Sequence, residues 1–193
     1  MAAVDLRANV HAPQAVPTDV GKADQADIGL DDQARPVLLN MAEVESKPIS
    51  WVWRSRIARG RLTLLAGHPG GGKSMFTCDA AARITTGTPW PDGTSCDLGR
   101  VLMMNAEDDP SDTIKPRLVA AGADCGRVSV LTASTFRDKE RVVTLADVDV
   151  IEDALREHDD YELLVIDPVG SYLGSGVDSY KDNETRAVLA PLA

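Results

Sequence analysis

The chain has 193 residues, of which 44% are hydrophobic and 26% are charged, a composition that suits one globular domain and excludes fibrous, collagen-like and wholly disordered proteins. Thirty acidic and twenty basic residues give a net charge of −10, which argues against a stand-alone nucleic-acid binder held by a basic surface. No apolar run approaches the ~20 residues that cross a bilayer, and the regions of a signal peptide are lacking, so the sequence predicts a cytoplasmic protein with no membrane contact.

The first part of the chain differs in composition from the rest. Residues 1–47 contain three prolines and no aromatic residue, and their acidic residues outnumber their basic ones. Such a segment has little apolar surface to bury, so we predict a disordered acidic leader. The folded domain is predicted to span residues 48–193, beginning with Trp51, Trp53 and the basic stretch 54–61.

Strands and helices alternate through the predicted domain. Short apolar runs predict buried strands, and apolar residues three or four positions apart predict helices with one buried face. In chain order we expect a strand at 62–66, a helix at 73–86, a strand at 101–105, a helix from Asp109 to Gly122, a strand at 127–131, a helix at 148–155 and a strand at 163–166. Gly87 is expected to end the first helix, and Asp109 to cap the second. This alternation predicts the α/β class: a mostly parallel sheet, helices on both faces, and ligands at the carboxyl ends of the strands.

The three cysteines are odd in number and far apart in the sequence, and none forms a C-x-x-C pair. This spacing favours neither a disulfide framework nor a zinc site. Cys78, Cys96 and Cys125 are therefore predicted to be small buried hydrophobic residues.

A glycine-rich segment lies between the first predicted strand and helix. Residues 67–74 read Gly-His-Pro-Gly-Gly-Gly-Lys-Ser and match the pattern G-x-x-x-x-G-K-[ST]. Glycines in this pattern let backbone N–H groups turn toward a phosphate, and the lysine neutralises the outer phosphates. The side chains of His68 and Pro69 are expected only to fill the loop. The predicted nucleotide-binding residues are Gly67, His68, Pro69, Gly70, Gly71, Gly72, Lys73, Ser74 and Met75.

Two residues are predicted to hold Mg²⁺. Ser74 closes the glycine-rich loop, where its hydroxyl is placed to ligate the ion. Asp167 follows the apolar run 163–166, at the position of a Walker B acid. An aspartate at the end of a buried strand can also be a turn former, but its combination with the glycine-rich loop favours the metal role.

Hydrolysis needs a group that orients or deprotonates the attacking water at the carboxyl end of a strand. Glu107 is the candidate, because it follows the strand 101–105 within Asn105-Ala106-Glu107-Asp108-Asp109. Asp109 is explained as a helix cap. Asp108 either supports the catalytic residues or is merely solvated, and we favour the solvated interpretation.

Together these segments resemble the RecA-like ATPases, in particular the plasmid- and phage-type group of AAA family ATPases related to the hexameric helicase RepA. The similarity covers residues 50–193 and rests on the loop 67–74, on Met-Met-Asn-Ala-Glu-Asp at 103–108 and on the strand that ends in Asp167. The resemblance implies that ATP and Mg²⁺ are bound, that Lys73 and Glu107 are catalytic, and that Ser74 and Asp167 hold the metal. It also implies a homo-oligomer, a hexamer, with single-stranded DNA in its channel, and it matches residues 170–181 to the loop that faces DNA in the recombinase branch.

The resemblance also carries an expectation about the sheet. In RecA-like proteins a strand with a polar sensor residue follows the Walker B strand and lies between it and the phosphate-loop strand. The sequence stops before such a strand, so we expect an N-terminal fragment whose sheet is incomplete and which contains neither the sensor nor an arginine finger. Strands 62–66 and 163–166 are then expected either to leave a gap or to pair directly, and the 193-residue chain alone to fold poorly and to hydrolyse ATP weakly.

The leading hypothesis is a Mg²⁺-dependent RecA-like ATPase, a helicase or replication-associated motor of a plasmid, phage or other mobile element. A nucleotide-kinase-like phosphotransferase would share the loop but needs an arginine-rich lid, which the sequence lacks, and it would leave Glu107 unexplained. A third alternative is a nucleotide-binding regulatory protein without significant hydrolysis. Measurements of ATP turnover distinguish it from the ATPase hypothesis.

Overall fold

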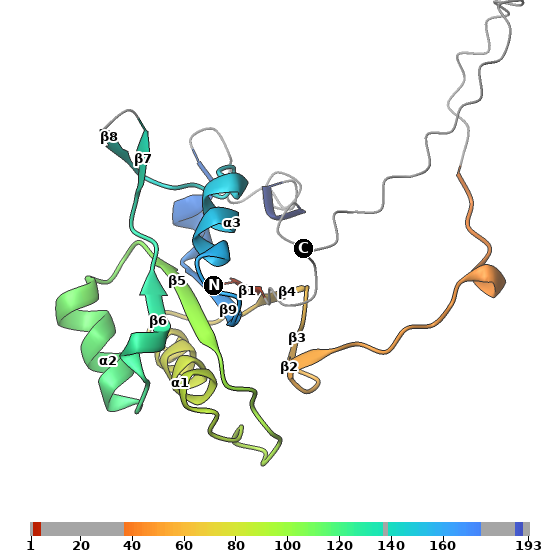
Figure 1. Ribbon diagram of the computed structural model, residues 1–193, viewed down its shortest axis with the longest axis horizontal. Coiled ribbons are helices and arrows are strands. Elements are labelled where there is room, and N and C mark those ends of the chain that lie inside the picture. Colours follow the sequence, from red (N-terminus) through yellow and green to blue (C-terminus); the bar gives the residue numbers. More distant parts are fainter. Residues whose placement is uncertain (1, 5–36, 137–138, 175–187, 191–193) are drawn as a thin grey trace, which may run out of the picture. The chain divides into compact units, whose positions relative to one another are not determined.

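The computed structural model of the chain describes residues 2–4, 37–136, 139–174 and 188–190 (Figure 1). The chain divides into two compact units, one made of residues 1–9 and 50–193 and the other of residues 10–49. In the described part of the smaller unit, Asn40 caps the 3-10 helix Met41–Glu43 by accepting a hydrogen bond from the backbone N–H of Ala42. All the predicted nucleotide-binding residues lie in the larger unit.

A five-stranded sheet lies at the centre of the larger unit (Figure 1). Its strands, in spatial order, are β4 (Leu62–Leu64), β1 (Ala2–Val4), β9 (Tyr161–Asp167), β5 (Arg100–Asn105) and β6 (Val128–Val130). β5 is parallel to both β9 and β6, whereas β1 is antiparallel to both β4 and β9. β4 therefore runs in the same direction as β9, and the prediction of a mostly parallel sheet is confirmed.

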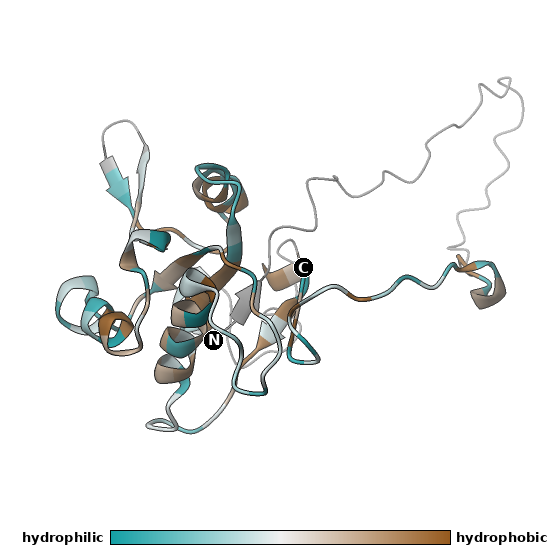
Figure 2. Cartoon of the chain, turned by 60° about the horizontal axis from the view of Figure 1, so that its bottom comes forward, coloured by the Kyte–Doolittle hydropathy of each residue, from teal (hydrophilic) through white to brown (hydrophobic). Residues whose placement is uncertain are grey.

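Helices cover both faces of the sheet, as predicted. One face packs against α1 (Lys73–Thr86) and α2 (Lys115–Ala120), and the other packs against α3 (Val148–Arg156). Leu163 and Val165 of β9 belong to the first core, and Leu164 and Ile166 to the second, as the alternation of side chains along a strand requires. Figure 2 colours the helices both brown and teal, as expected of elements with a buried and a solvated side. No helix in the described residues is long and apolar enough to span a membrane.

The first helix begins and ends where the sequence predicts. Gly87 follows α1 in the left-handed conformation, with φ +69°, and its N–H donates to the carbonyl of Arg83. Ala80 and Ile84 are buried against the sheet, but Phe76 on the same predicted face stays 38% exposed. The side of α1 near its N-terminus is therefore less tightly covered than the rest.

The second helix also begins at its predicted cap. The carboxylate of Asp109 accepts hydrogen bonds from the backbone N–H groups of Ser111 (2.7 Å) and Asp112 (3.3 Å). The first turn, Pro110–Ile114, is a π-helix that continues into α2, and Gly122 follows with φ +83°. The cap prediction is confirmed. The 3-10 helix Cys125–Arg127 then leads into β6, which is shorter than the predicted strand.

The position between β4 and β9 differs from the sequence-based expectation. That expectation was a gap or direct pairing of the two strands, and it is wrong, because β1 lies between them. Ala3 is opposite Thr63 of β4 and also opposite Val165 of β9. Residues 2–4 thus form part of the sheet although their composition placed them in the leader, of which residues 5–36 lie outside the described residues.

Two hairpins were not predicted. β2 (Trp51–Trp53) pairs with β3 (Ile57–Ala58), and β7 (Ser134–Phe136) pairs with β8 (Lys139–Arg141). The indole of Trp53 stacks on that of Trp90, with ring centroids 4.5 Å apart and an interplanar angle of 3°. The Nε1–H of Trp90 donates to the carbonyl of Val52 at 3.0 Å, which fastens the first hairpin to the core beside α1.

The cysteines are free thiols in or near the core. Cys78 and Cys96 are buried in the core on the α1 side of the sheet, and Cys125 packs partly buried against it. Their prediction as small buried hydrophobic residues is confirmed for Cys78 and Cys96, whereas Cys125 is only partly buried.

Candidate functional site

The glycine-rich loop of residues 67–74 leaves β4 and enters α1 at the carboxyl end of the parallel strands. Gly70 and Gly72 have φ angles of +74° and +79°, in the left-handed region that favours glycine. A Cβ on Gly71 would lie 3.0 Å from the carbonyl oxygen of His68, so a side chain there would crowd the loop. No side chain of the described residues caps the start of α1, whose first N–H groups therefore remain available to an anion.

Lys73 lies inside this loop. Its Nζ donates to the carbonyl oxygens of Gly67 (3.0 Å) and His68 (3.1 Å). The ammonium group is thus held over the backbone that would surround a phosphate, where it can exchange carbonyl oxygens for phosphate oxygens. His68, Pro69 and Met75, the remaining predicted members of the loop region, are exposed.

The structure brings together the two residues predicted to hold Mg²⁺. Ser74 Oγ donates a hydrogen bond to Asp167 Oδ2 at 3.0 Å. Asp167 is the last residue of β9 and is 8% exposed, so its carboxylate faces the start of α1 rather than solvent. A hydroxyl and one carboxylate are the hard oxygen ligands that Mg²⁺ accepts when phosphates and water complete its shell, so the residues present fit this ion. The described residues contain no group of three or more His, Cys, Asp or Glu side chains that could hold a metal by themselves.

Glu107 lies just beyond the neighbouring strand. Asn105, the last residue of β5, is the register partner of Asp167, and the N–H of Ala106 donates to the carbonyl of Asp167 at 3.1 Å. The side chain of Asn105 shapes the following turn, because its Oδ1 accepts hydrogen bonds from the N–H groups of Glu107 (3.0 Å) and Asp108 (2.8 Å). Glu107 is exposed at this turn. Sequence reasoning gave Asn105 no role, although an asparagine directly after a buried strand is a recognisable turn signal.

Asp108 is not merely solvated, so that interpretation is wrong. Its carboxylate accepts a hydrogen bond from Arg117 Nη1 of α2 at 2.6 Å. The pair lies near Cys78, whose pKa is raised chiefly by burial, with Arg117 opposing that effect and the charges of Asp108 and Asp167 adding to it. Arg117 therefore connects the turn after β5 to α2. The neighbouring residue Asp109 caps the helix, and hydrogen bonds from Ser111 and Asp112 lower the pKa of its carboxyl group.

Tyr172 is a further residue near the site that sequence reasoning missed. It ends the 3-10 helix Val169–Tyr172, which directly follows β9, and it is 5% exposed. Burial raises the pKa of its phenol to about 12, and the charge of Asp167 adds to this effect. The ring of Tyr172 belongs to the core on the α3 side of the sheet.

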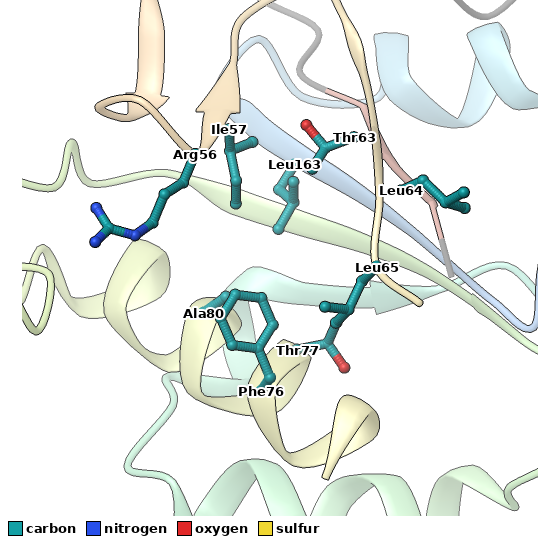
Figure 3. A pocket seen from close by; sticks show the side chains of 9 residues that line it. All are labelled: Arg56, Ile57, Thr63, Leu64, Leu65, Phe76, Thr77, Ala80 and Leu163. Carbon is teal, nitrogen blue, oxygen red and sulfur yellow. The ribbon is translucent and has the colours of Figure 1, made fainter. Parts of the chain in front are cut away.

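An apolar cavity of about 270 Å³ lies on the sheet side of α1 (Figure 3). Phe76 and Ala80 of α1, Leu65 after β4 and Leu163 of β9 surround it, as the close-up shows. The other lining residues are Arg56, Ile57, Thr63, Leu64 and Thr77. None of the glycines of the phosphate loop lines this cavity, so it is separate from the phosphate position.

The segment matched by resemblance to a DNA-facing loop, residues 170–181, is described only through residue 174. In that part, Tyr172 and Leu173 are buried in the α3-side core. The remaining residues of the segment, including Lys181, lie outside the described residues.

Comparison with known proteins identifies one family. The family model described as an AAA domain matches residues 31–193, a range that begins before the predicted domain start at residue 48. No curated protein matches the chain significantly, and neither does any solved structure.

Proposed function

Since this chain belongs to the AAA domain family of P-loop ATPases, whose members bind nucleotides, we propose that it hydrolyses ATP with Mg²⁺ where β4, α1, β5 and β9 meet. The observation that carries this proposal is the hydrogen bond between Ser74 Oγ and Asp167 Oδ2. It joins the end of the phosphate loop to the end of a buried strand and places two hard oxygen atoms together. A carboxylate that served only as a turn former would have no reason to face the start of α1.

The loop and Lys73 are proposed to bind the phosphates. Backbone N–H groups at the start of α1 and in the loop supply donors, and the helix N-terminus supplies partial positive charge. The Lys73 ammonium, which now donates to Gly67 and His68, would turn its hydrogen bonds to the outer phosphate oxygens.

Ser74 and Asp167 are proposed to hold Mg²⁺ through Oγ and Oδ2. When bound, the ion would offset the negative charge that develops on the phosphate oxygens. The protein contributes the fixed spacing of the two oxygen atoms, set by α1 on one side and β9 on the other.

Glu107 is proposed to orient the attacking water. Its exposed position lets its carboxylate reach a water molecule, while the Asn105 side chain fixes the turn that carries it. The pairing of Asn105 with Asp167 keeps this turn beside the metal-binding carboxylate. Oriented water and stabilised phosphate charge are the two contributions that phosphoryl transfer needs from a protein.

We further propose that this ATPase is a cytoplasmic helicase or replication motor of a plasmid, phage or other mobile element, active as a homo-oligomer on single-stranded DNA. The support is the resemblance carried by the loop 67–74, the segment 103–108 and the strand ending in Asp167. With a net charge of −10, DNA contacts would have to be confined to a local channel, because the outer surface repels phosphates.

The experiment that tests the proposed ATPase compares two variants of the full chain. Lys73→Ala removes the cation of the loop and should abolish ATP binding in a calorimetric titration. Glu107→Gln keeps size and hydrogen bonding but loses basicity, so binding should persist while phosphate release falls by ~10²-fold or more. Asp109→Asn, which can still cap α2, is the matched control and should change phosphate release only slightly.

Unchanged ATP affinity in Lys73→Ala would contradict the assignment of the phosphate loop. A larger loss of turnover in Asp109→Asn than in Glu107→Gln would mean that the wrong acid has been named. Tight binding with no turnover in the unaltered chain would support the regulatory alternative.

A further inference from the structure

Glu107, the proposed water-orienting residue, is held by its backbone. Its N–H donates to Asn105 Oδ1 at 3.0 Å, whereas its carboxylate is exposed and forms no ion pair within the described part of the chain. The direction in which this carboxylate points therefore depends on the backbone of residues 105–109. Whatever fixes this turn decides whether Glu107 can hold a water molecule in line with a phosphate.

The turn is fixed on both sides of Glu107. Before it, Asn105 ends β5, and the Oδ1 of Asn105 also accepts the N–H of Asp108 at 2.8 Å. After it, the Asp108 carboxylate accepts a hydrogen bond from Arg117 Nη1 at 2.6 Å. Asp108 is thus bound at two atoms, its backbone nitrogen and its Oδ2. Loss of the contact with Arg117 would leave the side chain of Asp108 without this anchor.

Arg117 has a fixed position because the helix that carries it is packed against the core. Leu118, the next residue of α2, is 3% exposed, and so is Ile114 in the preceding π-helix. Both belong to the same core as Cys78 of α1, the helix that begins at the phosphate loop. The side chains of Arg117 and Asp108 are 36% and 25% exposed, so their charges are screened less by salt than those of a fully exposed pair.

We propose that Arg117 is a positioning residue for ATP hydrolysis, which acts through Asp108 to hold the turn that carries Glu107. A continuous path of contacts then leads from the phosphate loop through α1 and α2 to this turn. The packing of α2 against α1 would thereby influence the rate of turnover without changing the affinity for ATP. The inference rests on the proposed ATPase, but one of its tests needs no nucleotide.

The first experiment measures the order of the turn in the full chain without nucleotide. Amide hydrogen exchange is followed by NMR at Glu107 and Asp108, whose N–H groups share one acceptor. Arg117→Gln removes the charged partner of Asp108 and should speed up both exchange rates by about fivefold or more. The N–H of Ala106, which is bonded to the end of β9, is the internal reference and should exchange at an unchanged rate.

The second experiment measures turnover and affinity separately. Arg117→Gln should lower kcat and kcat/KM for ATP equally, by about tenfold, because a misplaced Glu107 weakens only the transition state. ATP affinity in a calorimetric titration should change by less than about twofold. Asp108→Ala, which removes the carboxylate but keeps the N–H, should have the same effect. Lys115→Gln removes an exposed cation from the same helix and is the matched control, which should leave kcat unchanged.

A double variant distinguishes action through Glu107 from a direct contact with the nucleotide. In the Glu107→Gln background, adding Arg117→Gln should lower the remaining phosphate release by less than about twofold, because the residue that Arg117 positions has already lost its function.

A conservative variant tests the charge of Arg117. Arg117→Lys keeps the cation and should recover part of the kcat lost in Arg117→Gln, since the contact with Asp108 runs through Nη1 and Oδ2. Circular dichroism shows whether each variant keeps its secondary structure. If Arg117→Gln does not fold, Arg117→Lys is used in its place in the exchange and kinetic measurements, with smaller changes expected in the same direction.

Three results would overturn the proposal. The first is unchanged exchange at Glu107 and Asp108 when Arg117 is replaced. The second is a loss of ATP affinity that accounts for the whole loss of kcat/KM, which would make Arg117 a nucleotide contact. The third is a loss of turnover from Arg117→Gln that is as large in the Glu107→Gln background as with Glu107 present. An unaltered chain that does not hydrolyse ATP would instead refute the proposed function and leave the exchange measurement valid as the test of the turn.

Discussion

Ser74 and Asp167 are separated by 93 positions in the chain, yet their side chains share a hydrogen bond. The bond uses the same carboxylate oxygen and the same hydroxyl oxygen that a hard divalent cation would take. The Asp167 carboxylate is 8% exposed and faces the start of α1, which gives the metal role a geometric basis.

Removing the charge of this carboxylate should weaken metal binding selectively. Asp167→Asn keeps the size and the acceptor for Ser74 but loses the negative charge. We expect the Mg²⁺ concentration for half-maximal nucleotide binding to rise by about tenfold or more, the effect of ~1.4 kcal/mol. A Mg²⁺ titration at fixed nucleotide measures this, with the exposed Asp159→Asn at the other end of β9 as control. An unchanged titration would argue that Asp167 holds no metal.

Tyr172 predicts a distinct behaviour at high pH. Burial raises its pKa to about 12, above the ordinary value near 10, so the folded state favours the neutral phenol. The stability gained is fully present below about pH 10 and is lost as the pH rises through about 12. Tyr172 should therefore ionise late in an absorbance titration, and this late step should be absent in Tyr172→Phe.

At the residue scale, the sequence predicts what local chemistry dictates. The loop glycines, Lys73 and the capping Asp109 follow from spacing alone, because turn geometry and helix ends are local. The partner of Asp108 could not be predicted, since the reach of Arg117 depends on how α2 packs against the turn after β5.

Strand β5 begins in a crowded corner. A Cβ on Gly99 would lie 2.7 Å from the carbonyl oxygen of Asp160, next to the buried Glu162, which pairs with Arg59. The N–H of Gly99 donates to the carbonyl of Ile84 at 2.9 Å, so the end of α1 and the starts of β5 and β9 meet here.

Gly99→Ala should therefore destabilise the fold. The added methyl meets backbone that cannot move without disturbing β9, and overpacking of this kind costs about 1–3 kcal/mol. Urea unfolding measures the loss, and Gly170→Ala is the control because a Cβ there meets nothing within 4 Å. Equal stability of the two variants would show that this corner is looser than the structure indicates.

Elements with a strong internal pattern are the ones the sequence predicts. α1 has apolar residues four apart and a terminating glycine, and β9 is an apolar run buried on both faces. The hairpin β2–β3 lacks a two-residue turn signal, and its stability comes from Trp53 stacking on Trp90, a contact between segments far apart in the sequence. β1 is extended because it pairs with two partner strands. The composition of its three residues does not by itself predict a strand.

At the scale of the whole molecule, the filled position between β4 and β9 changes the expected stability. Poor folding was expected from a gap or a direct pairing, and that premise is wrong. We predict a cooperative thermal transition for the 193-residue chain, raised by Mg-ATP, since a ligand at 100 times its Kd adds about 2.7 kcal/mol to stability. Calorimetry with and without Mg-ATP measures this, and Lys73→Ala should lose the shift. A broad transition that does not depend on nucleotide would support the expectation that the 193-residue chain folds poorly.

The placement of β1 also sets an order of events during synthesis. Residues 2–4 leave the ribosome well before residues 161–167, and the site between β4 and β9 exists only once both of those strands are present. At 5–20 residues per second, residues 161–167 follow residues 2–4 after about 10–30 s. During this time β9 is missing from the central sheet. Pairings so distant in sequence slow folding, so the last step of refolding should be the closure of this sheet, long after α1 has formed.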